Sequence, residues 1–129
     1  MSEILLSEGE WKIMKQLWKN SSMSLGELVS ELAEETGWTK ATVYVMLKRL
    51  IAKNAVKLDE DEKIHRYSPL IPQREAEKGE TESFLCKVYN GRISLMISAL
   101  TDNKAISPDE LSELKQIIEK ASDNIGEKK

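Results

Sequence analysis

Residues 35–54 read ETGWTKATVYVMLKRLIAKN, in which one helix ends and another begins within a few residues. Gly37 is suited to the left-handed backbone conformation that follows a helix C-terminus. Thr39 can cap the next helix, because its hydroxyl accepts a hydrogen bond from a free N–H group of the first turn. The apolar residues of that helix recur at helical spacing and predict a buried stripe of Val43, Met46, Leu47, Leu50 and Ile51.

Two earlier helices are predicted by the same kind of local signal. Ser7 with Glu10, and Ser24 with Glu27, each have the spacing of a capping box, in which a serine and a glutamate satisfy each other's backbone N–H groups. Apolar residues at helical spacing follow both boxes, and residues 20–22 predict the end of the first helix. Three helices joined by tight turns therefore lead the chain.

A small hairpin is predicted to follow the third helix. Residues 55–58 and 64–68 have the character of short strands, and residues 59–63, DEDEK, form an acidic turn between them. Three helices closed by a hairpin make a winged helix-turn-helix, whose third helix enters the major groove of DNA. Pro69 and Pro72 mark the end of this head. The predicted fold class is mainly α with a small β-hairpin.

Residues 72–129 are predicted to form a helical segment after the winged helix-turn-helix head of residues 1–71. Ser107, Pro108 and Glu110 are typical of a helix start. The segment is too small to bury its apolar stripes alone, so we expect a second copy of the chain to cover them in a homodimer. Folding back on the head in a monomer is the alternative. The predicted dimerisation residues are Phe84, Leu85, Val88, Tyr89, Ile93, Met96, Ile97, Leu111, Leu114 and Ile118.

A basic island lies within a chain of net charge −3. Between Thr39 and Leu58 there are five basic residues and no acidic one. Such an island on the outer face of the third helix predicts contact with double-stranded DNA, with phosphate held by Lys48 and Arg49 and the residues nearer the helix start close to base edges. The predicted DNA-binding residues are Thr39, Lys40, Ala41, Thr42, Tyr44, Val45, Lys48, Arg49, Lys63 and Arg66.

Two other interpretations of this face stay open at the level of sequence. A basic island can be an ordinary solvated helix face. A winged helix can also serve as a protein-interaction module without sequence-specific DNA binding, because a fold does not by itself imply a function. Exposed Tyr44 and Val45 are compatible with that second interpretation. Salt-dependent binding to duplex DNA would separate these alternatives.

The composition is that of a soluble globular protein, with 129 residues of which 40% are hydrophobic and 32% charged. No apolar run approaches the length of a membrane span, and the N-terminus lacks the basic start of a secretory signal. We therefore expect a cytoplasmic protein without direct membrane insertion.

Catalytic and metal-binding signatures are missing from the sequence. His65 is the single histidine and falls in a predicted wing strand, whereas acid-base or nucleophilic catalysis needs converging groups. No phosphate-binding glycine loop, HExxH pattern or paired cysteines occur. We expect no enzyme activity, no cofactor and no metal. The single cysteine, Cys86, is predicted to be a buried and inert thiol.

Four stretches spread over nearly the whole chain carry a family resemblance. They are residues 6–18 (LSEGEWKIMKQLW), 31–56 (ELAEETGWTKATVYVMLKRLIAKNAV), 65–71 (HRYSPLI) and 83–91 (SFLCKVYNG). Together they resemble the penicillinase and methicillin-resistance repressor family. The resemblance implies a homodimer that binds an inverted-repeat operator, controls antibiotic-resistance genes of the beta-lactamase type, and is inactivated when a membrane-bound sensor metalloprotease triggers its cleavage.

The same resemblance places the cleaved bond between Ser98 and Ala99. Family members have Asn-Phe at this bond, whereas this chain has two small side chains there. The alternative is that both are ordinary small residues of a packed helix.

This chain departs from the family at positions that matter for DNA recognition. Residues 39–42 read TKAT where the family favours Ser-Pro-Lys-Thr, and Tyr44 and Val45 replace a polar or basic residue and a threonine. At the wing, residues 61–63 read DEK instead of Glu-Gly-Arg. We expect a different base preference. Residues 123–129 lack the cysteines of copper-responsive relatives, so copper sensing is not expected.

Overall fold

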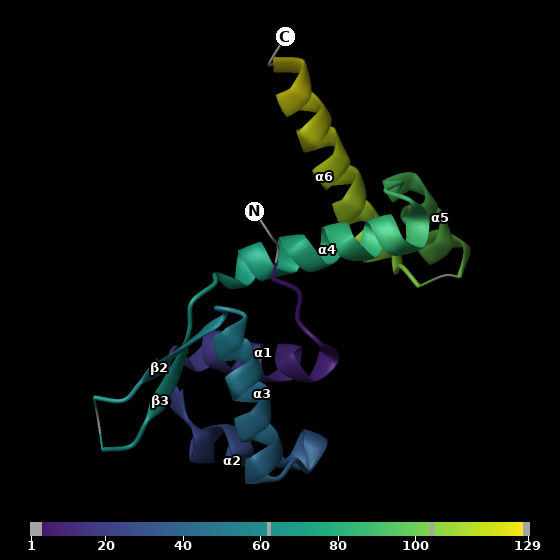
Figure 1. Cartoon of the computed structure of the whole chain (residues 1–129). Coiled ribbons are helices and arrows are strands. Elements are labelled where there is room, and N and C mark those ends of the chain that lie inside the picture. Colours follow the sequence, from purple (N-terminus) through teal and green to yellow (C-terminus); the bar gives the residue numbers. More distant parts are fainter. Residues whose placement is uncertain (1–3, 62, 104, 128–129) are drawn as a thin grey trace. The chain divides into compact units, whose positions relative to one another are not determined.

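The computed structural model describes residues 4–61, 63–103 and 105–127. Its elements in chain order are α1 (Glu8–Asn20), β1 (Met23–Ser24), α2 (Leu25–Thr36), α3 (Lys40–Ala52), β2 (Val56–Asp59), β3 (Arg66–Pro69), α4 (Gln73–Tyr89), α5 (Ile93–Asp102) and α6 (Pro108–Glu127) (Figure 1). This mainly helical fold with a small sheet confirms the predicted fold class. The chain divides into two compact units between Ser83 and Phe84.

In the first unit, all the helix caps that the sequence predicts are formed. The N–H of Ser7 donates to Oε1 of Glu10 at 2.7 Å, and the N–H of Glu10 donates to Oγ of Ser7 at 3.2 Å. Ser24 and Glu27 make the same reciprocal pair, at 2.8 and 3.2 Å. Gly37 ends α2 with φ of 66°, the left-handed conformation that glycine adopts without strain. These helices begin and end where the local sequence predicts.

The core of the first unit lies between α1, α2, α3 and the sheet. Its largest fully buried apolar side chains are Ile13, Met14, Leu17, Leu28, Leu32, Val43, Leu47, Leu50 and Val56. Trp18 lies at the edge, where its indole N–H donates to the carbonyl of Ile71 at 2.9 Å and ties α1 to the segment that leads into α4. Ala76 packs into this same core. The first part of α4 therefore belongs with the head, and the observed division at Ser83 lies beyond the boundary after residue 71 that the sequence predicts.

The sheet has three antiparallel strands in the order β1-β3-β2, whereas the sequence predicted a two-stranded hairpin. In the register, Met23 faces Tyr67 and Val56 faces Pro69. The strand that the sequence did not predict is β1. It has only two residues, and so short a segment has no alternating pattern that sequence could reveal. The two predicted wing strands are present, each shifted slightly toward the C-terminus.

The second unit leaves its apolar residues uncovered in the single chain. From Phe84 to Ile125, no described side chain is fully buried. Cys86 is also exposed, so the prediction of a buried thiol is wrong, because nothing in this unit covers its part of α4. Among the described residues, no helix combines the length and the apolar character that crossing a bilayer would need. The large exposed hydrophobic residues are Phe84, Val88, Ile93, Leu95, Leu100, Leu111, Ile117, Ile118 and Ile125.

Candidate nucleic-acid interface

The outer face of α3 carries the side chains that the sequence predicts to reach DNA. Thr39 caps the helix by accepting the N–H of Thr42 at 3.2 Å, and the two threonine hydroxyls lie 3.1 Å apart. Tyr44 and Val45 are 45% and 48% exposed, so both large side chains are accessible to a partner. Thr42 is half-buried, and the exposed members of the predicted set on this helix and its cap are Thr39, Lys40, Ala41, Tyr44, Val45, Lys48 and Arg49.

The charge on this face is of one sign. Lys40, Lys48 and Arg49 make no ion pair with any described acidic residue. Nζ of Lys48 lies 5.6 Å from the centre of the Tyr44 ring, a cation–π contact that holds the ammonium group beside the aromatic side chain. A face with several cations and no compensating anions attracts a polyanion.

An apolar hollow lies within this face. It has a volume of about 300 Å³ and is lined by Ala41, Thr42, Val45, Met46 and Arg49. The side chain of Met46 extends from α3 toward α1. A Cβ atom placed on Gly9 of α1 would be only 3.0 Å from Cε of Met46. The lack of a side chain at Gly9 therefore permits this position of Met46 beneath the hollow.

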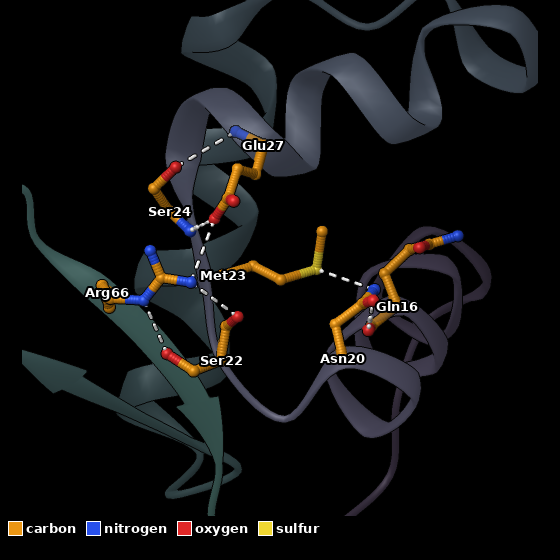
Figure 2. A network of polar contacts seen from close by, with 7 residues as sticks. All are labelled: Gln16, Asn20, Ser22, Met23, Ser24, Glu27 and Arg66. Atoms are coloured by element: carbon orange, nitrogen blue, oxygen red, sulfur yellow. Dashed lines mark hydrogen bonds and ion pairs between the residues drawn. The ribbon is translucent and has the colours of Figure 1, made fainter.

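In the wing, Arg66 makes contacts within the head that the sequence did not predict. Its Nε donates to Oγ of Ser22 at 2.9 Å, and its Nη2 donates to the carbonyl of Ser22 at 2.9 Å and lies 3.1 Å from Oε1 of Glu27 (Figure 2). The guanidinium group thus joins β3 to Ser22, the residue before β1, and to the first turn of α2. These contacts give Arg66 a role within the head, and its predicted contact with DNA stays a prediction. Lys63 is exposed at the wing, and Glu62 of the predicted acidic turn lies outside the described residues.

The surroundings of the Glu27 carboxyl, in this cluster of Arg66, Ser22 and Glu27, favour its charged form. The hydrogen bond from the N–H of Ser24 holds the pKa of the Glu27 carboxyl below its ordinary value, against partial desolvation, and the charge of Arg66 acts in the same direction. Glu27 is therefore ionised at neutral pH and remains a partner for Arg66. The sequence could not reveal these contacts of Arg66, because Ser22 and Arg66 are 44 residues apart.

A second member of the basic island also has a structural role. Nζ of Lys53 donates to the carbonyl of Leu5 at 2.9 Å and forms an ion pair with Glu10, whose side chain is only 2% exposed. Burial raises the pKa of the Glu10 carboxyl, but the hydrogen bonds from Lys53 and Ser7 outweigh it, so that this pKa lies below its ordinary value of 4.5. Lys53 compensates a buried carboxylate and is not part of the free cationic face.

We expect Lys53→Met to lower the free energy of unfolding by about 1–3 kcal/mol at pH 7, because it leaves the Glu10 carboxylate buried without its cation. Urea denaturation measures this change. Lys48→Met is the matched control, since it makes the same substitution on an exposed residue and should change stability by less than about 0.5 kcal/mol. Equal effects of the two substitutions would contradict the assignment of Lys53 to the framework.

The same pair sets the direction of a pH effect. A carboxyl whose pKa is lowered on folding stabilises the protein above its unfolded-state pKa and loses that contribution as pH falls through the folded-state value. The stability difference between the parent protein and Lys53→Met should therefore shrink as pH falls below about 4.3. Repeating the denaturation between neutral and acid pH checks this.

Comparisons with known proteins agree with this geometry. The family model described as penicillinase repressor matches residues 6–120. The penicillinase repressor of Bacillus licheniformis is 33% identical over 114 residues, covering 88% of this chain and 89% of the relative. The methicillin resistance regulatory protein MecI of Staphylococcus aureus (strain N315) is 25% identical over 115 residues, covering 89% and 94%. The solution structure of monomeric Bacillus licheniformis BlaI with the blaP half-operator aligns at TM-score 0.51 and 33% identity, over 58% of this chain and 93% of that chain. The chain belongs to the penicillinase repressor family.

Proposed function

We propose that this chain is a cytoplasmic, sequence-specific DNA-binding repressor that binds an inverted-repeat operator as a homodimer and controls antibiotic-resistance genes. The observation that carries the proposal is the outer face of α3, where Lys40, Lys48 and Arg49 are exposed without described acidic partners. Family membership supports it, as does the relative whose monomeric form was solved in complex with a half-operator.

The contacts are proposed to divide along α3. Residues nearer its N-terminus, including Ala41, Tyr44 and Val45, would lie close to base edges in the major groove. Lys48 and Arg49 would hold phosphate, which positions the helix without reading sequence. At the wing, Lys63 would add a phosphate contact.

We expect two kinds of effect when this face is changed. Lys48→Ala should weaken binding to all duplexes by a similar factor, because phosphate is common to every sequence. Val45→Thr should instead change the ranking of operator variants, by about 1–3 kcal/mol at the contacted base pair. Tyr44→Ala should also re-rank them, although Lys48 lies against that ring and the two effects will be coupled. Competition binding against single-base operator variants measures the ranking, and a uniform loss in Val45→Thr would contradict the proposed reading face.

The homodimer is proposed to form through the predicted helical segment of residues 72–129. Support comes from the described side chains from Phe84 to Ile125, none of which is fully buried in the single chain. Burial of apolar surface against a second copy would be the main term in association, at about 25 cal/mol per Å². In this proposal, the head, whose compact unit extends to Ser83, reads the operator, and the rest of the helical segment holds two heads together.

Relief of repression is proposed to occur by cleavage between Ser98 and Ala99 under a membrane-bound sensor metalloprotease. Both residues lie inside α5, where the carbonyl of Ser98 accepts a hydrogen bond from the Thr101 hydroxyl at 3.0 Å. A protease therefore needs α5 to open locally before it can cut. The cut would separate α6 from Ile93, Met96 and Ile97, which precede the bond, and so divide the proposed dimer interface.

The test of this relief is to expose producing cells to a cell-wall antibiotic and to measure intact masses of the recovered repressor. Fragments consistent with a break after Ser98 are expected. Induction of the target genes while only the full-length chain is present would contradict cleavage.

Unbiased selection of bound sequences from random duplex DNA tests the proposed function itself. A dimer with one reading helix per subunit should enrich an inverted repeat. Its half-site centres should lie one to two helical turns apart, each turn being about 34–36 Å. A selection that enriches no sequence would contradict the proposal.

A further inference from the structure

We infer that the hollow on α3 receives the 5-methyl group of a thymine in the operator, and that Val45 is the residue that makes this contact specific. The inference deepens the proposed DNA-binding function and rests on it. The hollow is lined by residues of α3, among them Ala41 and Val45, and one of its lining residues, Met46, packs against Gly9 of α1.

The lining of the hollow is suited to an apolar group. Ala41 and Val45 lie one helical turn apart and Met46 lies beside them, so three of the five lining residues are apolar. The Thr42 hydroxyl lies 3.1 Å from that of Thr39 and is thus already partnered, which leaves its methyl group to contact a ligand. Arg49 provides a cation at the edge.

The surroundings of the hollow indicate DNA as its occupant. Arg49 lines it, and Lys48, one helical turn from Val45, is exposed on the same side of α3, so that two cations beside the hollow complement phosphate. Each base pair shows a different set of groups in the major groove, and the thymine methyl is the apolar one among hydrogen-bond donors and acceptors. An apolar hollow brought against base edges by these cations therefore favours thymine over the other three bases.

The packing of Met46 fixes the shape of the hollow. Cε of Met46 lies 3.0 Å and its Sδ 3.3 Å from the place where a Cβ atom of residue 9 would stand, and the Trp38 ring is 3.3 Å from that same place. This close approach confines Met46 from the side of α1. Only Gly9 allows it without a shift of these side chains, so the hollow depends on the packing of two helices and not on α3 alone.

The experiment removes one methyl group at a time from the DNA. The probe is the tightest duplex from the selection, with each thymine replaced in turn by deoxyuridine, which leaves every hydrogen-bonding group unchanged. Fluorescence anisotropy with the full chain should show one thymine in each half-site whose replacement weakens binding by about fourfold, the effect of burying one methyl group.

Two variants assign the effect to a residue. In Val45→Ala, the thymine-to-deoxyuridine ratio at that position should fall to about one, because the alanine side chain is too short to contact the methyl group. In Lys48→Ala, both duplexes should bind more weakly while the fourfold ratio is kept, because a phosphate contact does not distinguish the two bases. Val45 is 48% exposed, so thermal denaturation should show Val45→Ala folded like the parent protein.

Each contrary result has a separate meaning. If the selected duplex binds tightly and no deoxyuridine substitution weakens it, the inference about the hollow is wrong while the proposed DNA-binding function stands. If the thymine preference persists in Val45→Ala, the methyl group is read elsewhere and the inference is equally wrong. If no duplex is selected or bound, the proposed function itself fails.

Discussion

Ile118→Asp is expected to convert the dimer into a monomer and to weaken operator binding by about 10²–10⁴-fold. Ile118 is 59% exposed in the single chain and belongs to the apolar face of α6 that we assign to the dimer. An aspartate there would place an unpaired charge in an apolar interface, which is strongly unfavourable. Separate subunits would then lose the gain in effective concentration that joining two reading heads provides. Sedimentation equilibrium measures the mass, and fluorescence anisotropy measures the affinity.

Gln116→Asp is the matched control for this substitution. It adds the same charge two residues away, which the geometry of an α-helix places on the other side of α6 from Ile118. We expect this variant to remain dimeric and to bind the operator like the parent protein. An Ile118→Asp protein that still sediments as a stable dimer would place the interface outside this face of α6.

The second large effect concerns salt. We expect operator affinity to fall by about 10³–10⁵ between 50 and 200 mM salt, as for proteins that make six to ten phosphate contacts. Two copies of the exposed cations on α3, β2 and the wing give at most ten such contacts, and these cations are Lys40, Lys48, Arg49, Lys57 and Lys63.

Two cations with different roles, Lys48 on the outer face of α3 and Lys53 in its ion pair with Glu10, sharpen this expectation. Lys48→Ala should make the slope of log affinity against log salt less steep by about two, one phosphate for each subunit. Lys53→Met should leave the slope unchanged, because Lys53 is paired with Glu10. A binding constant that does not change with salt would contradict phosphate contact by this face.

Local signals were the part of the fold that sequence could predict. The caps at Ser7, Ser24 and Thr39 and the glycine at the end of α2 depend on residues within four positions of each other, and the structure has all of them. Hydrophobic spacing likewise identified the buried sides of α1, α2 and α3, because a helix repeats its faces regularly.

Pairings between distant residues were the part that sequence could not predict. Arg66 was predicted to contact DNA and Lys53 was counted in the basic island, and the sequence indicated no partner for either, because Ser22 and Glu10 lie 44 and 43 residues away. Charge spacing along the chain carries no information about such partners. The strand β1 was missed for the same reason, since its two residues are defined only by their pairing with β3.

In the candidate sites, some features could be predicted from the sequence and others could not. The exposure of Tyr44 and Val45 followed from the period of α3, whereas the hollow beside Val45 depends on a contact between Gly9 and Met46 that no periodicity describes. In the second unit, four exposed apolar residues were not among the predicted dimerisation residues, namely Leu95, Leu100, Ile117 and Ile125. Ile117 follows the helical pattern of Leu114 and Ile118, so a wider apolar stripe on α6 would have included it.

The central claim is that α3 reads sequence and does not merely bind nucleic acid. Its most direct test compares the affinity of the full chain for the selected operator with that for a scrambled duplex of the same length and base composition, at one physiological salt concentration. The account predicts that the operator binds at least about 10³-fold more tightly, as specific DNA-binding proteins do. Equal affinity for the two duplexes would contradict it.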